Sequence, residues 1–494
     1  MIRFGKVLAP AVVLLSLGAS GVNVASALDL PTVQSASDWY TEGEQTVADK
    51  VAATTPETTA KNIILFVGDG MGVSTLTASR IYEGQLDSNP GEENYLSFEQ
   101  FPHTALVKTY NTNQQTPDSA GTMTAMMSGV KTKAGVIGYA PSTIRANCGS
   151  TVGANLTTAL ELAEYKGMAT GVVSTARITH ATPAATYAHS PDRNWEDDGS
   201  LPDEAVERGC ADIASQLVDF PFGDGIEVAL GGGRRHFLTE ADGGRRVARD
   251  LTSEWAGTYV ADKAGLDAFD ETSGEHLLGL FTSSHMSYEA DRPDTEPSIA
   301  DMTSKAIDVL EQDEDGFFLM VEAGRIDHAH HAGNAYRALE DTVAFSDAIA
   351  AATAKVDLSE TLIIVTADHS HVFTIAGYPT RGNPILGLVD TGIGADDLPY
   401  TTLGYANGPG ALNSSVEYLG DRDGSRVDLT SVDTTDPSFL QEAMVPLSSE
   451  THAGEDITVH ATGPGSQWFS GGTIEQNVIF HVMNAAGNLG GSRK

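Results

Sequence analysis

The sequence predicts an α/β fold, a three-layer α/β/α sandwich in which helices cover both faces of a large, mostly parallel central sheet. Near-continuous apolar runs are typical of strands that are buried on both faces. Such runs occur at 62–67 (NIILFV), 169–174 (ATGVVS), 226–230 (IEVAL), 317–321 (FFLMV) and 362–366 (LIIVT). Helical patterns separate them, as at 157–166 and 335–353. Strands that alternate with helices in this way indicate a parallel sheet.

The composition indicates a globular protein and argues against nucleic acid as a partner. Of the 494 residues, 41% are hydrophobic and 19% are charged, and the formal net charge is −38. Binding to a phosphate backbone draws on Lys and Arg, which are scarce here. Because the acidic residues are scattered along the chain, one hypothesis is a halophilic protein adapted to high salt, where repulsion is screened over about 3 Å at 1 M. An ordinary acidic exported protein is the alternative.

Residues 1–27 have the features of a secretory signal peptide. Arg3 and Lys6 precede an apolar centre, and Ala25-Ser26-Ala27 forms a small-residue cleavage site. No later segment approaches the ~20 uninterrupted apolar residues of a membrane span. We therefore expect an exported, soluble protein, periplasmic or extracellular, that does not associate with a membrane. Cys148 and Cys210 suit such a compartment as a disulfide, and two buried free thiols are the alternative.

The chain beyond the signal peptide divides into four segments by composition. Residues 28–60 are polar and Thr-rich and are expected to form an N-terminal arm. The core of the fold occupies 61–374 and resumes at 450–494. Between these parts, at 375–449, the helical period fades and Gly, Pro, Asp and Thr dominate, which predicts an inserted, loop-rich subdomain.

Potential metal ligands follow four of the predicted strands. Ligands of open α/β sheets gather outside the carboxyl ends of the strands, so these positions carry most of the functional information. In chain order they are Asp69, His180, Thr182, Glu322, Asp327, His328, His331, Asp368, His369 and His371. A single Asp after a strand is usually a cap or a turn former, but four such strand ends favour a metal centre. Mixed imidazole and carboxylate donors suit Zn²⁺, whereas oxygen donors alone suit Mg²⁺.

The segment 116–122 (TPDSAGT) offers a candidate nucleophile, Ser119. Its small neighbours allow a substrate to approach closely, and a helix that starts here would stabilise negative charge through its free backbone N–H groups. The alternative is that Ser119 merely caps a helix.

Together these motifs resemble those of the alkaline phosphatase family. The segments VGDGMG, TPDSAGT, ITHATPAA followed by Arg193, VEAGRIDHAHH, VTADHSH and THAGED occur in the family's order, and the resemblance runs from about Lys61 to Val482. It implies hydrolysis of small phosphate monoesters to an alcohol and phosphate. It also implies two Zn²⁺ and one Mg²⁺ per subunit and a homodimer.

The resemblance also implies a role for each candidate residue. Ser119 would be the nucleophile that becomes phosphoserine, and Arg193 would hold two phosphate oxygens. Asp327, His331 and His452 would bind the first zinc. Asp69, Asp368 and His369 would bind the second zinc, which Ser119 also faces. Magnesium would take Asp69, Thr182 and Glu322. Two zincs about 4 Å apart can stabilise both the entering and the leaving oxygen of a phosphoryl transfer.

Two positions near the phosphate vary within that family. This chain has His180 and His328, as animal members do, where enterobacterial members carry Asp and Lys. A His in place of Lys removes a fixed positive charge at alkaline pH, so the resemblance implies faster release of phosphate. The alternative is that both His are structural.

Three further features follow from the resemblance to animal members. The Cys148–Cys210 pair resembles one of their disulfides. The loops 378–382 and 404–410 resemble their crown subdomain, which helps to form the dimer. Near Phe281 those enzymes have a calcium site, but Thr282 stands here in place of an acidic ligand, and whether Glu296 retains that site is left open.

Other functions remain possible at this stage. A phosphodiesterase or nucleotide pyrophosphatase of the same superfamily usually has Thr as nucleophile and lacks the context of Arg193. A sulfatase would need a Cys/Ser-x-Pro-x-Arg motif, which Ser119 does not have. An exported metal-binding protein without catalysis would account for the His clusters but would leave Ser119 and Arg193 without a purpose.

Overall fold

The computed structural model describes residues 30–53, 59–412 and 426–490. The proposed signal peptide at 1–27 lies outside these residues. None of the helices within them is long and apolar enough to cross a membrane.

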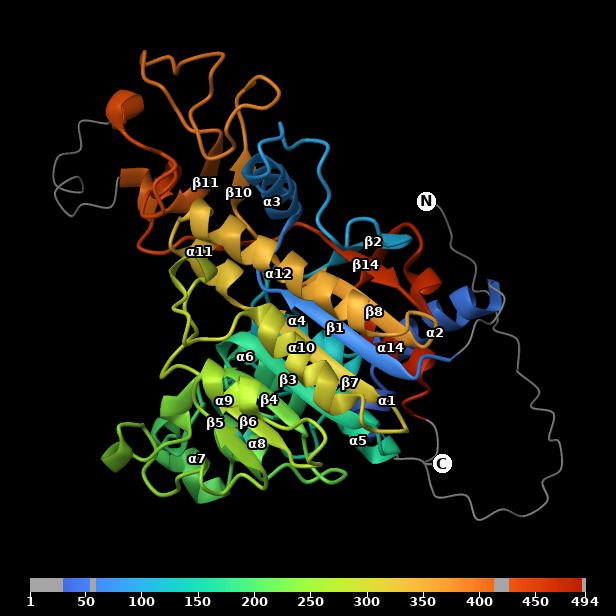
Figure 1. Ribbon diagram of the computed structural model, residues 1–494. Helices are drawn as coiled ribbons and strands as arrows, with labels where there is room; N and C mark the ends of the chain where they lie inside the picture. The colour runs from blue at the N-terminus through green and yellow to red at the C-terminus, as the bar shows by residue number, and fades with distance from the viewer. Residues whose placement is uncertain (1–29, 54–58, 413–425, 491–494) are drawn as a thin grey trace, which may run out of the picture.

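A ten-stranded sheet forms the centre of the molecule (Figure 1). The strand order is β15-β2-β14-β8-β1-β7-β3-β4-β6-β5, and the strands from β8 to β5 run parallel to one another. The strands are β1 (Asn62–Gly68), β2 (His103–Lys108), β3 (Ala169–Arg177), β4 (Val228–Gly232), β5 (Thr258–Val260), β6 (Leu277–Leu280), β7 (Phe317–Ala323), β8 (Thr361–Ala367), β14 (Ile457–Thr462) and β15 (Thr473–Glu475). The predicted fold class is confirmed, and each of the five predicted runs is a strand of this sheet.

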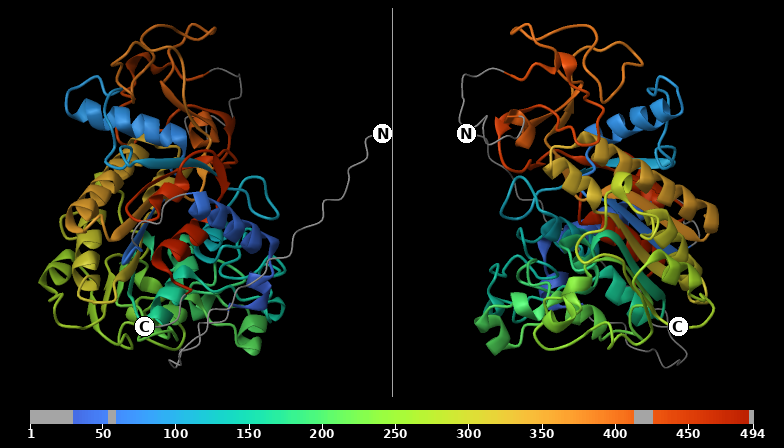
Figure 2. Two further views of the ribbon diagram at one scale, coloured as in Figure 1. Left: turned by 90° about the vertical axis from the view of Figure 1, so that its right-hand side faces the viewer. Right: turned by 60° about the vertical axis from the view of Figure 1, so that its left-hand side comes forward.

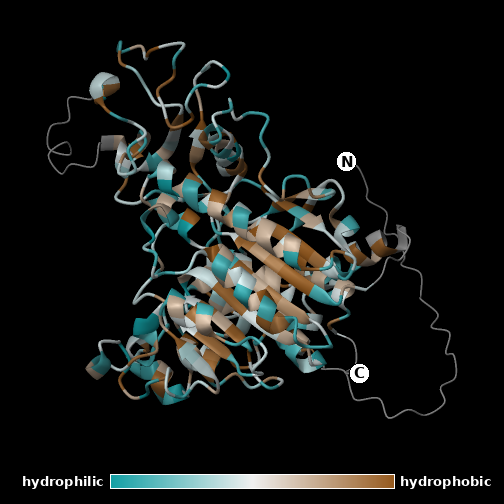
Figure 3. Cartoon of the chain, viewed as in Figure 1, coloured by the Kyte–Doolittle hydropathy of each residue, from teal (hydrophilic) through white to brown (hydrophobic). Residues whose placement is uncertain are grey.

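Helices cover both faces of the sheet, as the apolar runs require. Helices α10 (Ile299–Leu310) and α12 (Ala335–Lys355) lie on one face, against β3, β7 and β1. Helices α5 (Ala159–Lys166), α6 (Ala181–Tyr187) and α14 (Val478–Gly487) also contact β1, β3 or β7. Figure 3 shows that hydrophobic residues concentrate in the central strands and hydrophilic ones on the outer turns and loops. The two predicted helices correspond to α5 and α12.

Local sequence signals fix the ends of these helices. Thr158 accepts from the backbone N–H of Glu161, whose carboxylate accepts from Thr158 in return, and this capping box starts α5. Gly167 ends the helix in the left-handed conformation, at φ 84°. Ser298 and Asp301 form the same box at the start of α10.

The N-terminal segment packs against the core. Helices α1 (Thr32–Ser35) and α2 (Asp38–Ala53) follow each other here. Gln34 is fully buried and donates to the backbone carbonyls of Ser128 and Thr157, at 2.8 and 3.1 Å. The ring of Tyr40 lies 6.0 Å from that of Phe480 in α14. The segment expected as an arm therefore contributes buried side chains.

Two small sheets lie beyond the carboxyl ends of the central strands. Strands β10 (Phe373–Ile375), β11 (Leu403–Gly408) and β12 (Ala443–Pro446) form one sheet, and β9 (Ser370–His371) pairs with β13 (His452–Ala453) in the other. The rest of 376–449 that the structure describes consists mainly of loops and short 3₁₀ turns. Figure 2 shows these loops projecting from one end of the body, beside α3 (Val73–Leu86).

A disulfide joins Cys148 to Cys210, with the two Cα atoms 6.1 Å apart. Of the two alternatives for these cysteines, a disulfide or two buried free thiols, the structure contains the disulfide. Trp195 and Ala205 pack around it in a small apolar cluster. The bridge thus ties the segment after α7 (Asp203–Arg208) to the 3₁₀ turn at 148–150.

Replacing both cysteines by Ser should lower the free energy of unfolding by about 2–4 kcal/mol, because the bridge closes a long loop and so restricts the unfolded chain. Denaturant unfolding of both proteins, with and without reductant, measures this. Reductant should destabilise the parent protein and leave the double variant unchanged. Equal stability of the oxidised parent and the variant would contradict the prediction.

Candidate active site

The predicted ligand residues meet at one edge of the central sheet, because β1, β3, β7 and β8 run parallel and end there. Asp69 follows β1, and Asp368 and His369 follow β8. Gly70 makes the close approach possible. It has φ +71°, and a Cβ at this position would lie 2.4 Å from the ring of His371.

The first group of donors combines Asp327, His331 and His452. Helix α11 (Arg325–His331) places Asp327 and His331 one turn apart, as their spacing predicts. The Nε2 atoms of both histidines lie 3.3 Å from Asp327 Oδ1 and 3.0 Å from each other. Their Nδ1 atoms donate to the carbonyls of Glu450 and Pro117, at 2.6 and 2.8 Å. The Nε2 lone pairs therefore face inward, as in a metal site whose outer partners fix the imidazole tautomers.

The second group combines Asp69, Asp368 and His369, all fully buried. His369 Nε2 lies 3.4 Å from Asp69 Oδ1 and 3.2 Å from Asp368 Oδ2. Asp69 Oδ1 has no hydrogen-bond partner among the residues that the structure describes. Burial, and next the charge of Asp368, raise the pKa of Asp69 well above its usual range. A divalent cation between these oxygens would neutralise the repulsion, so the group fits a metal.

The third group provides mainly oxygen donors. Thr182 Oγ1 donates to Asp69 Oδ2 at 3.5 Å, and Glu322 lies close to Asp69 and His180. Glu322 accepts from Ser174 through Oε2, while its buried Oε1 is without a partner in the described chain. Carboxylate and hydroxyl oxygens are donors that Mg²⁺ prefers.

Ser119 is the first residue of helix α4 (Ser119–Ser128) and lies beside the second group. Its Oγ is 3.3 Å from His369 Nε2. The N-cap is Asp118, whose side chain accepts from the backbone N–H of Gly121 at 3.1 Å. Because Asp118 fills the capping position, the alternative role of Ser119 as N-cap is excluded. The Ser119 hydroxyl therefore does not cap the helix, and it lies at the positive end of α4.

Arg193 lies beside Asp118, the N-cap of helix α4. Its Nη1 donates to Asp118 Oδ2 at 3.1 Å, and its Nη2 lies 3.1 Å from His180 Nε2. His180 packs near His328, with ring centroids 5.5 Å apart. Burial, and next the charge of Arg193, lower the pKa of His180 well below its usual value, and burial lowers the pKa of His328 to about 3.

Three residues around the site were not singled out in the sequence: Asp118, His285 and Glu450. His371 was named there only as a potential metal ligand. His371 Nε2 donates to Asp327 Oδ1 at 2.8 Å, and its Nδ1 donates to the Glu450 carboxylate at 2.5 Å. Although burial opposes the charged form, Glu450 and Asp327 raise the pKa of His371 to about 10. The ring of His285 packs against that of His328, with centroids 4.0 Å apart and the planes tilted by 57°. Asp118 accepts from Arg193. Only two of these four residues could have been recognised from the sequence. Asp118 directly precedes Ser119, and His371 lies two positions after His369.

Comparison with known proteins identifies the same family as the sequence motifs do. The family model described as alkaline phosphatase matches residues 60–489. The tissue-nonspecific alkaline phosphatase of Gallus gallus is 43% identical over 478 residues, covering 92% of this chain and 90% of the relative. The alkaline phosphatase of Gadus morhua is 42% identical, covering 88% and 93%. This chain belongs to the alkaline phosphatase family.

Solved structures of alkaline phosphatases also match the fold. The enzyme from the Antarctic bacterium TAB5 superimposes with a TM-score of 0.60 at 25% identity, covering 87% of this chain and 99% of that one. The enzyme from Thermus thermophilus gives 0.63 at 26% identity, covering 88% and 93%. The chain is thus an alkaline phosphatase by family, and its His and Asp groups are candidate sites for the metal cofactors that the family implies.

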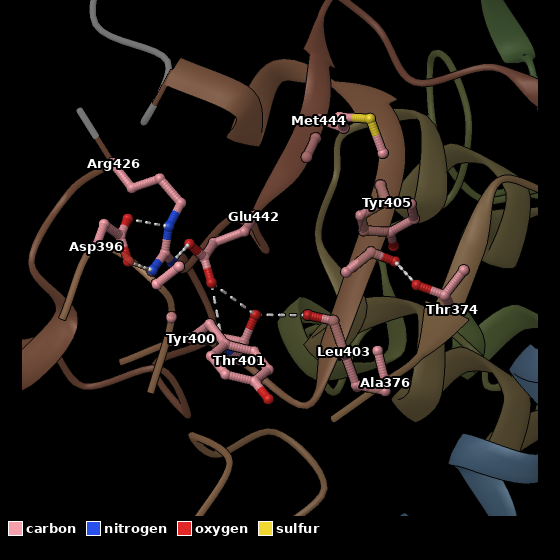
Figure 4. A pocket seen from close by; sticks show the side chains of 14 residues that line it. Thr374, Ala376, Asp396, Tyr400, Thr401, Leu403, Tyr405, Arg426, Glu442 and Met444 are labelled. Atoms are coloured by element: carbon pink, nitrogen blue, oxygen red, sulfur yellow. Dashed lines mark hydrogen bonds and ion pairs between the residues drawn. The ribbon is translucent and has the colours of Figure 1, made fainter. Parts of the chain in front are cut away.

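A separate cavity of about 530 Å³ opens beside the three-stranded sheet of the phosphatase (Figure 4). Tyr400, Leu403 and Met444 contribute to its lining. Arg426 at its rim is neutralised by Asp396 and Glu442, at 2.8 and 2.6 Å. None of the residues that line it belongs to the donor groups described above.

Glu450→Gln should weaken zinc binding by about 10- to 100-fold, because the Glu450 carboxylate orients His371 and, through it, Asp327. Equilibrium dialysis against Zn²⁺ measures the affinity. Glu254→Gln, which removes an exposed carboxylate bound to Arg249, is the matched control and should not change it. Equal affinity in the parent protein and Glu450→Gln would show that the outer carboxylate is dispensable.

Proposed function

We propose that this alkaline phosphatase hydrolyses phosphate monoesters through a phosphoserine formed on Ser119, at a centre that binds two zinc ions and one magnesium ion. The observation that carries the proposal is the position of the Ser119 hydroxyl. It lies 3.3 Å from His369, at a helix start, beside two groups of inward-facing imidazole and carboxylate donors.

The donor groups support a specific assignment of the metals. Asp327, His331 and His452 would hold one zinc, and Asp69, Asp368 and His369 would hold the other, with Ser119 facing it. Glu322, Thr182 and Asp69 would hold magnesium. When bound, the zinc pair supplies Lewis-acid stabilisation of the negative charge on the entering and leaving oxygens.

Ser119 acts as the nucleophile in this proposal. The Ser119 hydroxyl gives its proton to water, and its Oγ forms a bond to phosphorus as the bond from phosphorus to the ester oxygen breaks. The departing ester oxygen takes a proton from water, so that the substrate leaves as an alcohol. Water then attacks the phosphoserine, which returns the Ser119 hydroxyl and releases phosphate. His369 directs Nε2 toward two carboxylates as well as Ser119, so it suits metal binding better than a role as general base.

Arg193 would bind two oxygens of the phosphoryl group. Its planar guanidinium matches the geometry of a phosphate in a way that the point charge of Lys does not. Asp118 fixes one edge of the guanidinium and at the same time caps the helix of Ser119. This arrangement holds the Arg193 guanidinium and the Ser119 hydroxyl in a fixed position relative to each other.

The proposed contacts involve only the phosphoryl group, so the alcohol portion of the substrate is not selected by them. This favours broad specificity for small monoesters. A diester would place a second substituent on an oxygen that Arg193 is proposed to hold, so monoesters should react faster than diesters.

Ser119→Ala should reduce hydrolysis of p-nitrophenyl phosphate by at least about 10³-fold, because no other group can form the covalent intermediate. Ser273→Ala, in an exposed loop, is the control and should keep full activity. Chelation by EDTA should abolish activity in the parent protein, and Zn²⁺ with Mg²⁺ should restore it. Activity that survives in Ser119→Ala would overturn the covalent route.

His328→Lys should strengthen inhibition by phosphate by about tenfold, because a Lys keeps its charge at alkaline pH while a His does not. His328→Gln, which is neutral at every pH, should leave the inhibition constant close to that of the parent protein. Steady-state kinetics with added phosphate measure both. An unchanged inhibition constant in His328→Lys would mean that His328 is structural.

The setting of the enzyme is also part of the proposal. The apolar, basic-flanked segment 1–27 supports export to the periplasm or the medium, and the loops of 375–449 support a crown-like insertion and a homodimer. The proposal includes no calcium ion, because the two side chains at the position of the animal calcium site already have hydrogen-bond partners. The Glu296 carboxylate already accepts from the N–H and hydroxyl of Ser287, and Thr282 Oγ1 donates to the Ser284 carbonyl.

The net charge of −38 supports an enzyme of saline surroundings. The temperature of unfolding should therefore rise as NaCl is increased from low concentration to about 1 M, because salt screens the repulsion among surface carboxylates. Thermal unfolding followed by circular dichroism measures this. Maximal stability in low salt would contradict the halophilic interpretation.

A further inference from the structure

A second group of donors lies at the opposite edge of the central sheet, where the parallel strands begin. Glu227 directly precedes β4 and His276 directly precedes β6, and these strands are neighbours in register. The N–H of Leu277 donates to the carbonyl of Glu227 at 2.7 Å, which fixes the two residues side by side. Asp224 comes from the turn before Glu227. A strand of seven residues spans roughly 20 Å, so this edge is remote from Ser119.

The three side chains converge as metal ligands do. A ring nitrogen of His276 and carboxylate oxygens of Asp224 and Glu227 lie within 4.8 Å of one another. His276 Nδ1 donates to the carbonyl of Ile226 at 3.1 Å, which leaves the lone pair on Nε2. Glu227 accepts from the N–H of Thr170 through Oε2 at 2.6 Å, which leaves Oε1 available. Outer hydrogen bonds of this kind orient the ligands of metal sites.

A buried carboxylate beside this group indicates that a positive charge belongs there. Glu164 in α5 is 1% exposed, and its Oε1 accepts from the hydroxyl of Thr170. Its Oε2 has no hydrogen-bond partner within residues 30–53, 59–412 and 426–490. This oxygen lies against Gly223, the residue before Asp224, where an added Cβ would be 2.1 Å away.

The charged groups nearest to Glu164 are carboxylates as well, so they repel a negative charge on Glu164. Burial, and next the charge of Glu227, raise the pKa of Glu164 to about 9, and Asp224 and Asp313 add to the effect. Burial raises the pKa of Glu227 to about 8. The Glu164 oxygen that is unpartnered within the described residues therefore lies in a corner of the molecule to which Asp224 and Glu227 add negative charge.

We propose that Asp224, Glu227 and His276 bind one divalent cation of the zinc class, separate from the phosphatase centre, with Glu164 as an outer carboxylate beside the ligands. One imidazole and two carboxylates suit Zn²⁺, with water in the fourth position, whereas Ca²⁺ and Mg²⁺ prefer oxygen donors alone. Because the ligands precede β4 and β6 and contact the start of β3, the ion would hold the beginnings of three strands together.

The metal content of the active, full-length enzyme tests this inference. The parent protein, dialysed against micromolar Zn²⁺, should contain one zinc more per chain than His276→Gln or Asp224→Asn, as measured by mass spectrometry. Turnover of p-nitrophenyl phosphate should be the same in all three, because the site is remote from Ser119. Asp224 is exposed, so its substitution should not prevent folding.

Glu275→Gln is the matched control. It removes a neighbouring exposed carboxylate that accepts from Thr258 but is not a ligand, and it should retain the extra zinc. Added Zn²⁺ should also raise the unfolding temperature of the parent protein and of Glu275→Gln more than that of the two ligand variants. An equal zinc content in parent and ligand variants would overturn the proposal. Displacement of the extra zinc by millimolar Ca²⁺ would overturn its assignment to the zinc class.

Discussion

An excess of negative charge at the carboxyl edge of the central sheet is the constraint on which the architecture of the candidate active site depends. Asp69, Glu322, Asp327 and Asp368 are all at most 4% exposed, and they lie close enough to repel one another. Burying one carboxylate without a partner costs several kcal/mol, so this group is stable only with cations or with protons. The imidazole lone pairs among these carboxylates favour cations over protons. The backbone allows the close grouping at Gly70, because a side chain there would collide with the ring of His371.

A second layer of contacts holds this group in place and connects it to the loop-rich region. Glu450, just before β13, fixes His371 and accepts from the N–H of Val372. On the adjoining side, His330 is fully buried between the Thr75 hydroxyl of α3 and the Tyr405 hydroxyl of β11. The small sheet is therefore joined by hydrogen bonds to the helix that carries Asp327 and His331. A change in the small sheet can reach the proposed metal ligands Asp327 and His331 through His330, without contacting the substrate.

The sequence predicted the parts of the fold that are buried on both sides, and it was less informative elsewhere. In the run 62–67 every residue after Asn62 is apolar, so its assignment to a buried strand, β1, needed no further information. The strands β2 and β14 alternate between buried and more exposed residues, which is a weaker signal, and they were not predicted. Most of the candidate ligand residues could be found because parallel strands end at one edge, whereas His452 was named only through the family resemblance. His285 and Glu450 could not, since they come from irregular segments whose path depends on tertiary contacts.

Asp118 shows why the site behaves as a unit. Its carboxylate accepts from the N–H groups of Gly121 and Gly135, from the Asn111 amide and from Arg193, at 2.8 to 3.1 Å. One side chain thereby starts the helix of Ser119 and orients the guanidinium. The negative charge of Asp118 should also repel a bound phosphate, because it lies against the Arg193 guanidinium, which is proposed to bind the phosphoryl oxygens. In the proposed mechanism, the alignment of Ser119 and the retention of phosphate therefore depend on the same carboxylate, so a substitution at Asp118 should alter both together.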